Sequence, residues 1–201
     1  MICAIVLAAG RSRRMGTQKL LLSWGNKTVI AQVVDEILRG PVQKVFVIVG
    51  DDGEPVAKAL AGRDVSFVSN PNPESEMLES VRCGLRVLPA DCVAVLVAMG
   101  DQPTITAELL GEIVRAFRET NRGIVIPTFE GRRGHPMLFA ARFRDEVMGE
   151  FNGEGLSGLR QKHSPEVLEL PAASAHVLED LDTPADYERL HARQFSPTSG
   201  E

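Results

Sequence analysis

The chain has 201 residues and a formal net charge of −5 at pH 7, and 44% of its residues are hydrophobic. This length suits one domain with a full hydrophobic core, and the mildly acidic balance argues against general nucleic-acid binding, which needs a basic face. No apolar run approaches the length of a membrane span and no signal-peptide pattern opens the chain, so we expect a cytoplasmic protein without a membrane partner. Three cysteines, Cys3, Cys83 and Cys92, lack C-x-x-C spacing and are expected to be buried small residues rather than zinc ligands or disulfides.

The apolar run at residues 2–7 predicts a strand that is buried on both faces. The loop after it holds two glycines, Gly10 and Gly16, which let the backbone turn its N–H groups toward an anion. Four cations lie in or next to this loop: Arg11, Arg13, Arg14 and Lys19. The glycine spacing fits neither a Walker A loop nor a dinucleotide fingerprint. The pattern therefore predicts a polyphosphate site of another kind, with an ordinary basic surface turn as the alternative.

Buried strands and amphipathic helices alternate from there to residue 117. The expected helices are 29–39, capped by Thr28, then 54–60, 77–88 and 107–117, capped by Thr106. The expected strands are 44–49, 65–68 and 92–98. This alternation predicts a Rossmann-like α/β fold of three layers, α/β/α, with a mostly parallel sheet. Because ligands bind such sheets beyond the carboxyl ends of the strands, we expect the loops at Gly10 and Asp101 to face one crevice.

The second half of the chain is less regular. We expect strands at 124–127, 135–139, 167–170 and 176–179, with a polar excursion at 128–134. Helices are expected at 140–148 and 155–162, and a last one is opened by Thr183 as cap and Pro184 at its first position. No linker or repeat marks a second domain, so the prediction is a single domain over 1–193 and a flexible C-terminal tail over 194–201.

The loop belongs to a longer motif that reads Leu7-Ala8-Ala9-Gly10-x-Ser12-x-Arg14-Met15-Gly16-x-x-Lys19. This motif resembles the signature of the MobA-like NTP transferases, the family of the molybdopterin guanylyl- and cytidylyltransferases. Further motifs of that family recur in order: Asn70-Pro71, Ser80, Gly100-Asp101-Gln102-Pro103, Gly134-His135-Pro136 and Asp180-Leu181-Asp182-Thr183-Pro184. The Ala-Ala form of the first motif is more similar to the cytidylyltransferase branch than to the guanylyl branch.

The resemblance implies a domain of the nucleotide-diphospho-sugar transferase type. The implied enzyme is Mg²⁺-dependent, transfers CMP from CTP to the phosphate of the molybdenum-pterin cofactor and releases pyrophosphate. The implied partners are the nucleoside triphosphate and the phosphorylated pterin acceptor, with a molybdoenzyme or its maturation factor as a candidate protein partner. Matched to the motifs, the expected nucleotide-binding residues are Leu7, Ala8, Ala9, Gly10, Arg11, Ser12, Arg14, Lys19, Asn70, Ser80 and Gly100.

The chemistry of the residues agrees with these roles. Arg14 and Lys19 suit the β- and γ-phosphates, and with Asp101 they form the expected catalytic set. Asp101 at the end of a buried strand is a hard oxygen ligand of the kind that Mg²⁺ prefers. Asp182 is the expected second metal ligand, with Asp180 as an alternative and stabilisation of the last helix as the other role for Asp182. The resemblance places His135 on the acceptor side, and a satisfied interior histidine is the alternative.

Two departures from the family pattern concern the substrate. Glu76 stands where the family usually has glycine, and residues 153–160 lack the usual Gly-Asp-x-Gly-Ala-Arg form. Two alternatives therefore stay open beside the cytidylyltransferase. One is a nucleotidyltransferase that uses another NTP and a sugar or polyol phosphate. The other is a cofactor-delivery module without catalysis.

Overall fold

The computed structural model describes residues 1–10, 18–72 and 76–195. The predictions for Arg11, Ser12 and Arg14 lie outside the described residues. The large sheet contains β1 (Ile2–Ala8), β4 (Lys44–Val49), β5 (Ser66–Ser69), β6 (Ala94–Met99), β7 (Ile124–Phe129), β8 (Arg132–Arg133), β9 (Met137–Ala140) and β10 (Val167–Pro171). A separate small hairpin joins β2 (Ser23–Trp24) to β3 (Lys27–Thr28).

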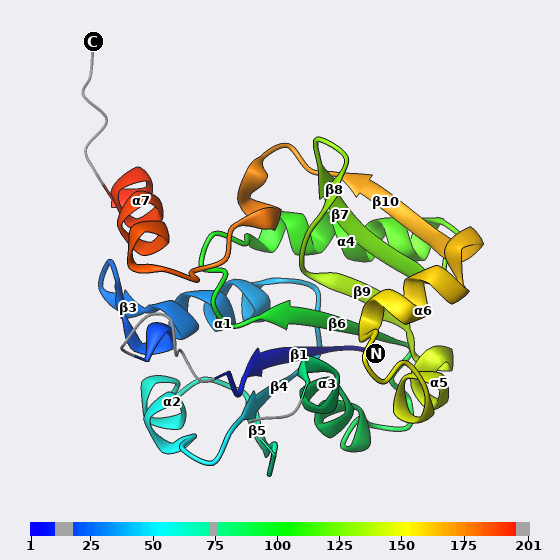
Figure 1. Cartoon of the computed structure of the whole chain (residues 1–201), viewed down its shortest axis with the longest axis horizontal. Coiled ribbons are helices and arrows are strands. Elements are labelled where there is room, and N and C mark those ends of the chain that lie inside the picture. Colours follow the sequence, from blue (N-terminus) through cyan, green and yellow to red (C-terminus); the bar gives the residue numbers. More distant parts are fainter. Residues whose placement is uncertain (11–17, 73–75, 196–201) are drawn as a thin grey trace.

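The strands follow the order β10-β7-β9-β6-β1-β4-β5, and β8 pairs with β7 (Figure 1). The central strand β1 is parallel to both of its neighbours, β4 and β6. The parallel pairs β4–β5 and β7–β10 extend the sheet on either side. β9 is antiparallel to both β6 and β7, because the chain turns back after the β7–β8 hairpin. The predicted α/β fold with a mostly parallel sheet is confirmed.

Seven α-helices are described: α1 (Val29–Arg39), α2 (Glu54–Ala59), α3 (Met77–Arg86), α4 (Ala107–Glu119), α5 (Arg144–Gly149), α6 (Leu156–Lys162) and α7 (Pro184–Phe195). The predicted caps hold, since Thr28 accepts from the Ala31 N–H and Thr106 accepts from the Leu109 N–H. α7 continues to Phe195, past the expected domain boundary at 193. No helix within residues 1–10, 18–72 and 76–195 combines the length and the apolar character that a membrane span needs.

Successive residues of β1 point to opposite faces of the sheet, as the period of two requires. Ala4 and Val6 join the core under α1 and α4. Cys3 and Ile5 join the core under α3 and α5. All three cysteines are buried and unpaired, as the sequence predicts. Two helix layers therefore cover the sheet, and its strand ends carry the loops that can bind ligands.

One expected element is wrong. Residues 176–179 are not a strand, because Ala175–Leu178 form a 3₁₀-helix, η4. The parallel ladder on β7 is already filled by β10 and ends where the Ala172 N–H donates to the Thr128 carbonyl. The η4 segment instead crosses the end of the sheet, where the Val177 carbonyl accepts from the His135 N–H at 2.9 Å.

Candidate active site

The first site residue, Lys19, opens the 3₁₀-helix η1 (Lys19–Leu21) after the basic loop. Its Nζ lies 2.5 Å from Oδ2 of Asp101 and 3.1 Å from Oδ1 of Asp182. Lys19, Asp101 and Asp182 are distant in sequence, and all three lie where β1 and β6 end. The predicted crevice between the Gly10 and Asp101 loops is confirmed.

Gly100 fixes the backbone of this crevice. Its N–H donates to the Leu7 carbonyl at 3.0 Å, which joins the end of β6 to the end of β1. A Cβ atom at position 100 would lie 2.8 Å from the same carbonyl oxygen. The close approach of the two strand ends therefore needs glycine, and it sets the position of Asp101.

The charges of the crevice are strongly coupled. Burial by itself would lower the pKa of Lys19, but Asp101 and Asp182 outweigh it and raise that pKa above its usual value. The Lys19 ammonium therefore stays charged. Asp101 is 6% exposed, and its Oδ1 atom is buried without a hydrogen-bond partner among the described residues. A buried carboxylate oxygen without a partner is costly unless a ligand satisfies it.

The segment from Asp180 to Asp182 is held in place on both sides. The Leu181 N–H donates to the Asp101 carbonyl at 3.1 Å, and the Leu181 side chain is fully buried beside Trp24. Behind it, α7 begins with a reciprocal cap in which Thr183 and Asp186 bond to each other's backbone N–H. The capped start of α7 therefore positions Asp182, whose carboxylate faces Lys19.

Asp180 faces the same crevice but has a different partner, because its Oδ1 accepts from the Gln102 amide. Burial raises the pKa of Asp180, and the Gln102 hydrogen bond opposes that shift. Of the two candidates for a second metal ligand, Asp182 is thus the one in contact with Lys19, and Asp180 is held by an amide.

These groups surround a cavity of about 380 Å³. Its described lining residues are Leu7, Ala8, Ala9, Gly10, Lys19, Leu20, Met77, Ser80, Met99, Asp101, Asp180 and Asp182. The structure thus brings together the described residues of the first motif, Ser80 and both metal-ligand candidates. Asn70 lies behind this wall, since it is 1% exposed and its Nδ2 donates to Ser80 Oγ at 2.9 Å. Asn70 therefore orients the Ser80 hydroxyl and does not itself line this cavity.

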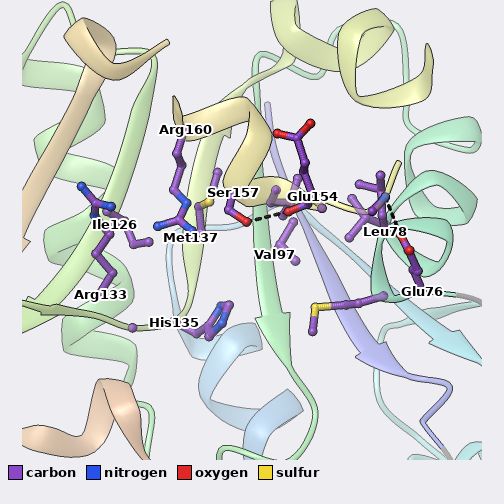
Figure 2. A pocket seen from close by; sticks show the side chains of 16 residues that line it. Glu76, Leu78, Val97, Ile126, Arg133, His135, Met137, Glu154, Ser157 and Arg160 are labelled. Atoms are coloured by element: carbon purple, nitrogen blue, oxygen red, sulfur yellow. Dashed lines mark hydrogen bonds between the residues drawn. The ribbon is translucent and has the colours of Figure 1, made fainter. Parts of the chain in front are cut away.

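A second cavity of about 560 Å³ adjoins the first (Figure 2). Met77, at the start of α3, lines both cavities and is 53% exposed. The lining is largely apolar, from Leu78, Val81, Val97, Ile126, Met137 and Leu156. The two spaces therefore meet at one side chain. Charged residues line both: Lys19, Asp101, Asp180 and Asp182 the smaller cavity, and Glu76, Arg133, Glu154 and Arg160 the larger one.

His135, the predicted acceptor-side residue, lines the larger cavity. Burial lowers the pKa of His135, while the nearby charges of Asp180 and Asp101 act in the opposite direction. Its Nδ1 is buried without a hydrogen-bond partner among the described residues. The preceding Gly134 has no space for a side chain, since a Cβ atom there would lie 2.1 Å from the Val177 carbonyl. Burial therefore favours the neutral form of the His135 imidazole.

Sequence reasoning missed two features of the larger cavity. Arg160 from α6 lines it, whereas the sequence marked residues 153–160 only as a departure from the family pattern and gave Arg160 no role. Glu76, noted only as a departure, accepts a hydrogen bond from the Gly153 N–H at 2.9 Å. That bond joins the start of α3 to the loop before α6. The two segments that depart from the family pattern are therefore in contact.

A divalent metal fits the smaller cavity when a nucleotide brings further ligands. Within the described ranges, no three His, Cys, Asp or Glu side chains form a group that could hold a metal ion. Mg²⁺ commonly uses one or two carboxylates and takes its other oxygens from phosphates and water. Asp101, with its unpartnered buried oxygen, and Asp182 provide that donor set.

Comparison with known proteins identifies the chain as a nucleotidyltransferase, a class whose substrates the two adjoining cavities could hold. The chain is similar to the molybdenum cofactor cytidylyltransferase of Escherichia coli (strain K12), with 24% identity over 193 residues, 92% of this chain and 93% of that protein. It is 28% identical to a probable molybdenum cofactor guanylyltransferase of Methanosarcina mazei, over 80% of this chain and 70% of that one.

Among solved structures, Rv0371c from Mycobacterium tuberculosis H37Rv aligns with a TM-score of 0.84 and 28% identity, covering 94% of this chain and 96% of that one. Its complex with manganese aligns with a TM-score of 0.79. Residues 4–167 match the family of the MobA-like NTP transferase domain, and the chain belongs to that family.

Proposed function

We propose that this nucleotidyltransferase is a Mg²⁺-dependent cytidylyltransferase that transfers CMP from CTP to the phosphate of the molybdenum-pterin cofactor. The observation that carries the proposal is the pair of adjoining cavities, one lined by Lys19, Asp101 and Asp182 and the other largely apolar. The similarity to a molybdenum cofactor cytidylyltransferase over nearly the whole chain supports the same substrates. A molybdoenzyme or its maturation factor stays the candidate protein partner.

The smaller cavity suits the triphosphate. Lys19 lines it beside Asp101, and its ammonium can bind phosphate oxygens once a nucleotide is present. Backbone groups from Leu7 to Gly10 line the same space, and Ser80 offers a hydroxyl. Asp101 and Asp182 would hold Mg²⁺, which would neutralise phosphate charge and polarise the α-phosphoryl group when it is bound.

The larger cavity suits a heterocyclic acceptor better than a sugar. A sugar or polyol presents many hydroxyl groups, and each needs a polar partner when it is buried. Aliphatic and thioether side chains form one part of the lining, and that part matches the face of a flat fused ring. His135 also lines this cavity, where its imidazole can contact the acceptor.

The reaction is a displacement at the α-phosphorus of CTP. An oxygen of the acceptor phosphate forms a new bond to that phosphorus, while the bond from phosphorus to the α–β bridging oxygen breaks. The bridging oxygen leaves with the electron pair as part of pyrophosphate, so no proton transfer is required when the acceptor phosphate is ionised. Lys19 stabilises the charge on the phosphates, and the two cavities bring nucleophile and phosphorus together.

The test measures pyrophosphate release and the dinucleotide product with Mg²⁺, molybdenum-loaded pterin and each of CTP, GTP, ATP and UTP. We expect release with CTP that depends on the acceptor and stops when the acceptor is omitted. Faster turnover of GTP than of CTP would contradict the proposal that the nucleotide is CTP. Turnover of only sugar or polyol phosphates would contradict the acceptor, and tight binding without pyrophosphate would favour a delivery module.

A further inference from the structure

The hydrogen bond between Glu76 and Gly153 joins two segments that both line the larger cavity. Glu76 lies directly before Met77 at the start of α3, and its Oε2 accepts from the Gly153 N–H at 2.9 Å (Figure 2). Gly153 belongs to the loop between α5 and α6, 77 positions further along the chain. A hydrogen bond to a carboxylate is stronger than one between neutral groups. It therefore holds the start of α3 against a distant part of the chain.

This bond lies on the boundary between two spaces. A groove of about 360 Å³, here called the side groove, shares Glu76 and Leu78 with the larger cavity. Asn152 lines the side groove, whereas Gly153, the next residue, lines the larger cavity. The contact of Glu76 with Gly153 therefore closes the larger cavity toward the side groove.

The loop that receives the bond has a costly backbone conformation. Phe151, Gly153 and Gly155 have positive φ angles of 66°, 79° and 61°. Phe151 carries most of the cost, because a residue with a Cβ atom rarely adopts this conformation. Such a conformation persists only where the surrounding contacts determine it. The loop therefore depends on the groups that hold it from outside.

Arg82, also on α3, holds the chain before the loop. Its Nε donates to the Val147 carbonyl at 2.9 Å, and a terminal nitrogen donates to the Glu150 carbonyl at 2.7 Å. Glu76 holds the middle of the loop at Gly153. Since α3 contacts this region at two points, loss of the Glu76 bond should leave the protein folded and release the part of the loop that lines the cavity.

The residues directly after Gly153 form one wall of the larger cavity. They are Glu154, Gly155, Leu156 and Ser157. The Ser157 hydroxyl donates to the Glu154 carbonyl at 2.5 Å, which keeps this turn compact. A shift of Gly153 away from Glu76 would therefore move the wall and join the cavity to the side groove.

We infer that Glu76 is a positioning residue for the acceptor, because its bond to Gly153 fixes the wall at 153–157 and closes the larger cavity on that side. The inference rests on the proposed function, since it takes the larger cavity as the acceptor site. It also gives a role to the departure at position 76. Glycine, the usual residue of the family there, has no side chain that could accept this hydrogen bond.

The experiment compares wild type with Glu76→Ala and Glu76→Gln, using molybdenum-loaded pterin phosphate at saturating CTP. For Glu76→Ala we expect KM for the acceptor to rise roughly tenfold, since one hydrogen bond to a charged group is lost. The value of kcat and the calorimetric affinity for CTP should stay as in wild type. Glu76→Gln keeps an oxygen that can accept from Gly153, so it should recover most of the loss. Glu112→Ala, at an exposed glutamate on α4, is the control for the lost charge and should match wild type.

Hydrogen exchange measured by mass spectrometry tests the wall without turnover. In peptides that cover residues 151–157, exchange should be roughly tenfold faster in Glu76→Ala and close to wild type in Glu76→Gln. Melting temperatures show that each variant is folded.

An acceptor KM that is unchanged in Glu76→Ala would overturn the inference, even if exchange became faster. Equal effects of Glu76→Ala and Glu76→Gln would also overturn it, because the charge and not the hydrogen bond would then be the cause. The same holds if weaker binding of CTP accounts for the rise in KM. Wild-type protein that releases no pyrophosphate with the pterin acceptor would instead overturn the proposed function, so the two failures are distinguishable.

Discussion

Replacing Asp101 with asparagine is expected to lower kcat/KM for CTP by roughly 10³-fold or more. The substitution keeps the shape of the side chain and removes the carboxylate whose Oδ1 is buried without a partner among the described residues. It also removes the anion that holds Lys19. Pyrophosphate release measures the rate, and titration of Mn²⁺ monitored by paramagnetic resonance measures metal binding in the presence of CTP.

The matched control is Asp64→Asn, an exposed aspartate far from the strand ends that carry the site. It should keep both the rate and the metal affinity of wild type. If Asp101→Asn retained full activity, the assignment of Asp101 to the metal and the phosphates would be wrong. If it lost activity but also lost its cooperative thermal transition, the more conservative Asp101→Glu would replace it in the comparison.

Replacing Lys19 with methionine should act on activity and stability together. Without the ammonium, kcat/KM for CTP should fall by roughly 10²-fold, because one cation at the phosphates is lost. Asp101 then lies beside Asp182 without its cation, and breaking the largely buried Lys19–Asp101 pair costs about 3 kcal/mol in the free energy of unfolding. The Asp182 side chain is 52% exposed, so water screens its charge and its pair with Lys19 adds little. A divalent cation can take the place of the ammonium between the two carboxylates.

We therefore expect Mg²⁺ to raise the melting temperature of Lys19→Met more than that of wild type, since the cation binds only the folded state. Differential scanning calorimetry with and without Mg²⁺ measures the difference. Lys58→Met, an exposed lysine on α2, serves as the control and should respond like wild type. An equal response of Lys19→Met and wild type to Mg²⁺ would contradict the placement of the metal at these carboxylates.

The sequence predicts the central sheet well because its strands are buried on both faces. The runs that became β1, β4 and β6 are almost uninterrupted apolar segments, and α1 and α4 begin at clear threonine caps. The crevice follows from the parallel order, since the loops after β1 and β6 leave adjacent strand ends. Lys19 and Asp101, which are distant in sequence, lie next to each other for this reason.

Local pattern does not determine the remaining features. The position of β9 between β6 and β7 depends on the turn back after the β7–β8 hairpin, and no short-range signal encodes that neighbour. The η4 segment has a strand-like sequence, but the sheet offers it no partner. The place of Arg160 in the larger cavity became known only from the structure. The supporting role of Asn70 behind the smaller cavity likewise became known only from its hydrogen bond to Ser80.

The central claim is that Lys19, Asp101 and Asp182 form a site for CTP with Mg²⁺. Calorimetric titration of CTP, GTP, ATP and UTP into the wild-type protein, with Mg²⁺ and then with EDTA, tests it most directly. We predict one site per chain with a clear preference for CTP that disappears without Mg²⁺ and in Asp101→Asn. Preference for another base, or CTP binding that is unchanged in EDTA and in Asp101→Asn, would contradict the account.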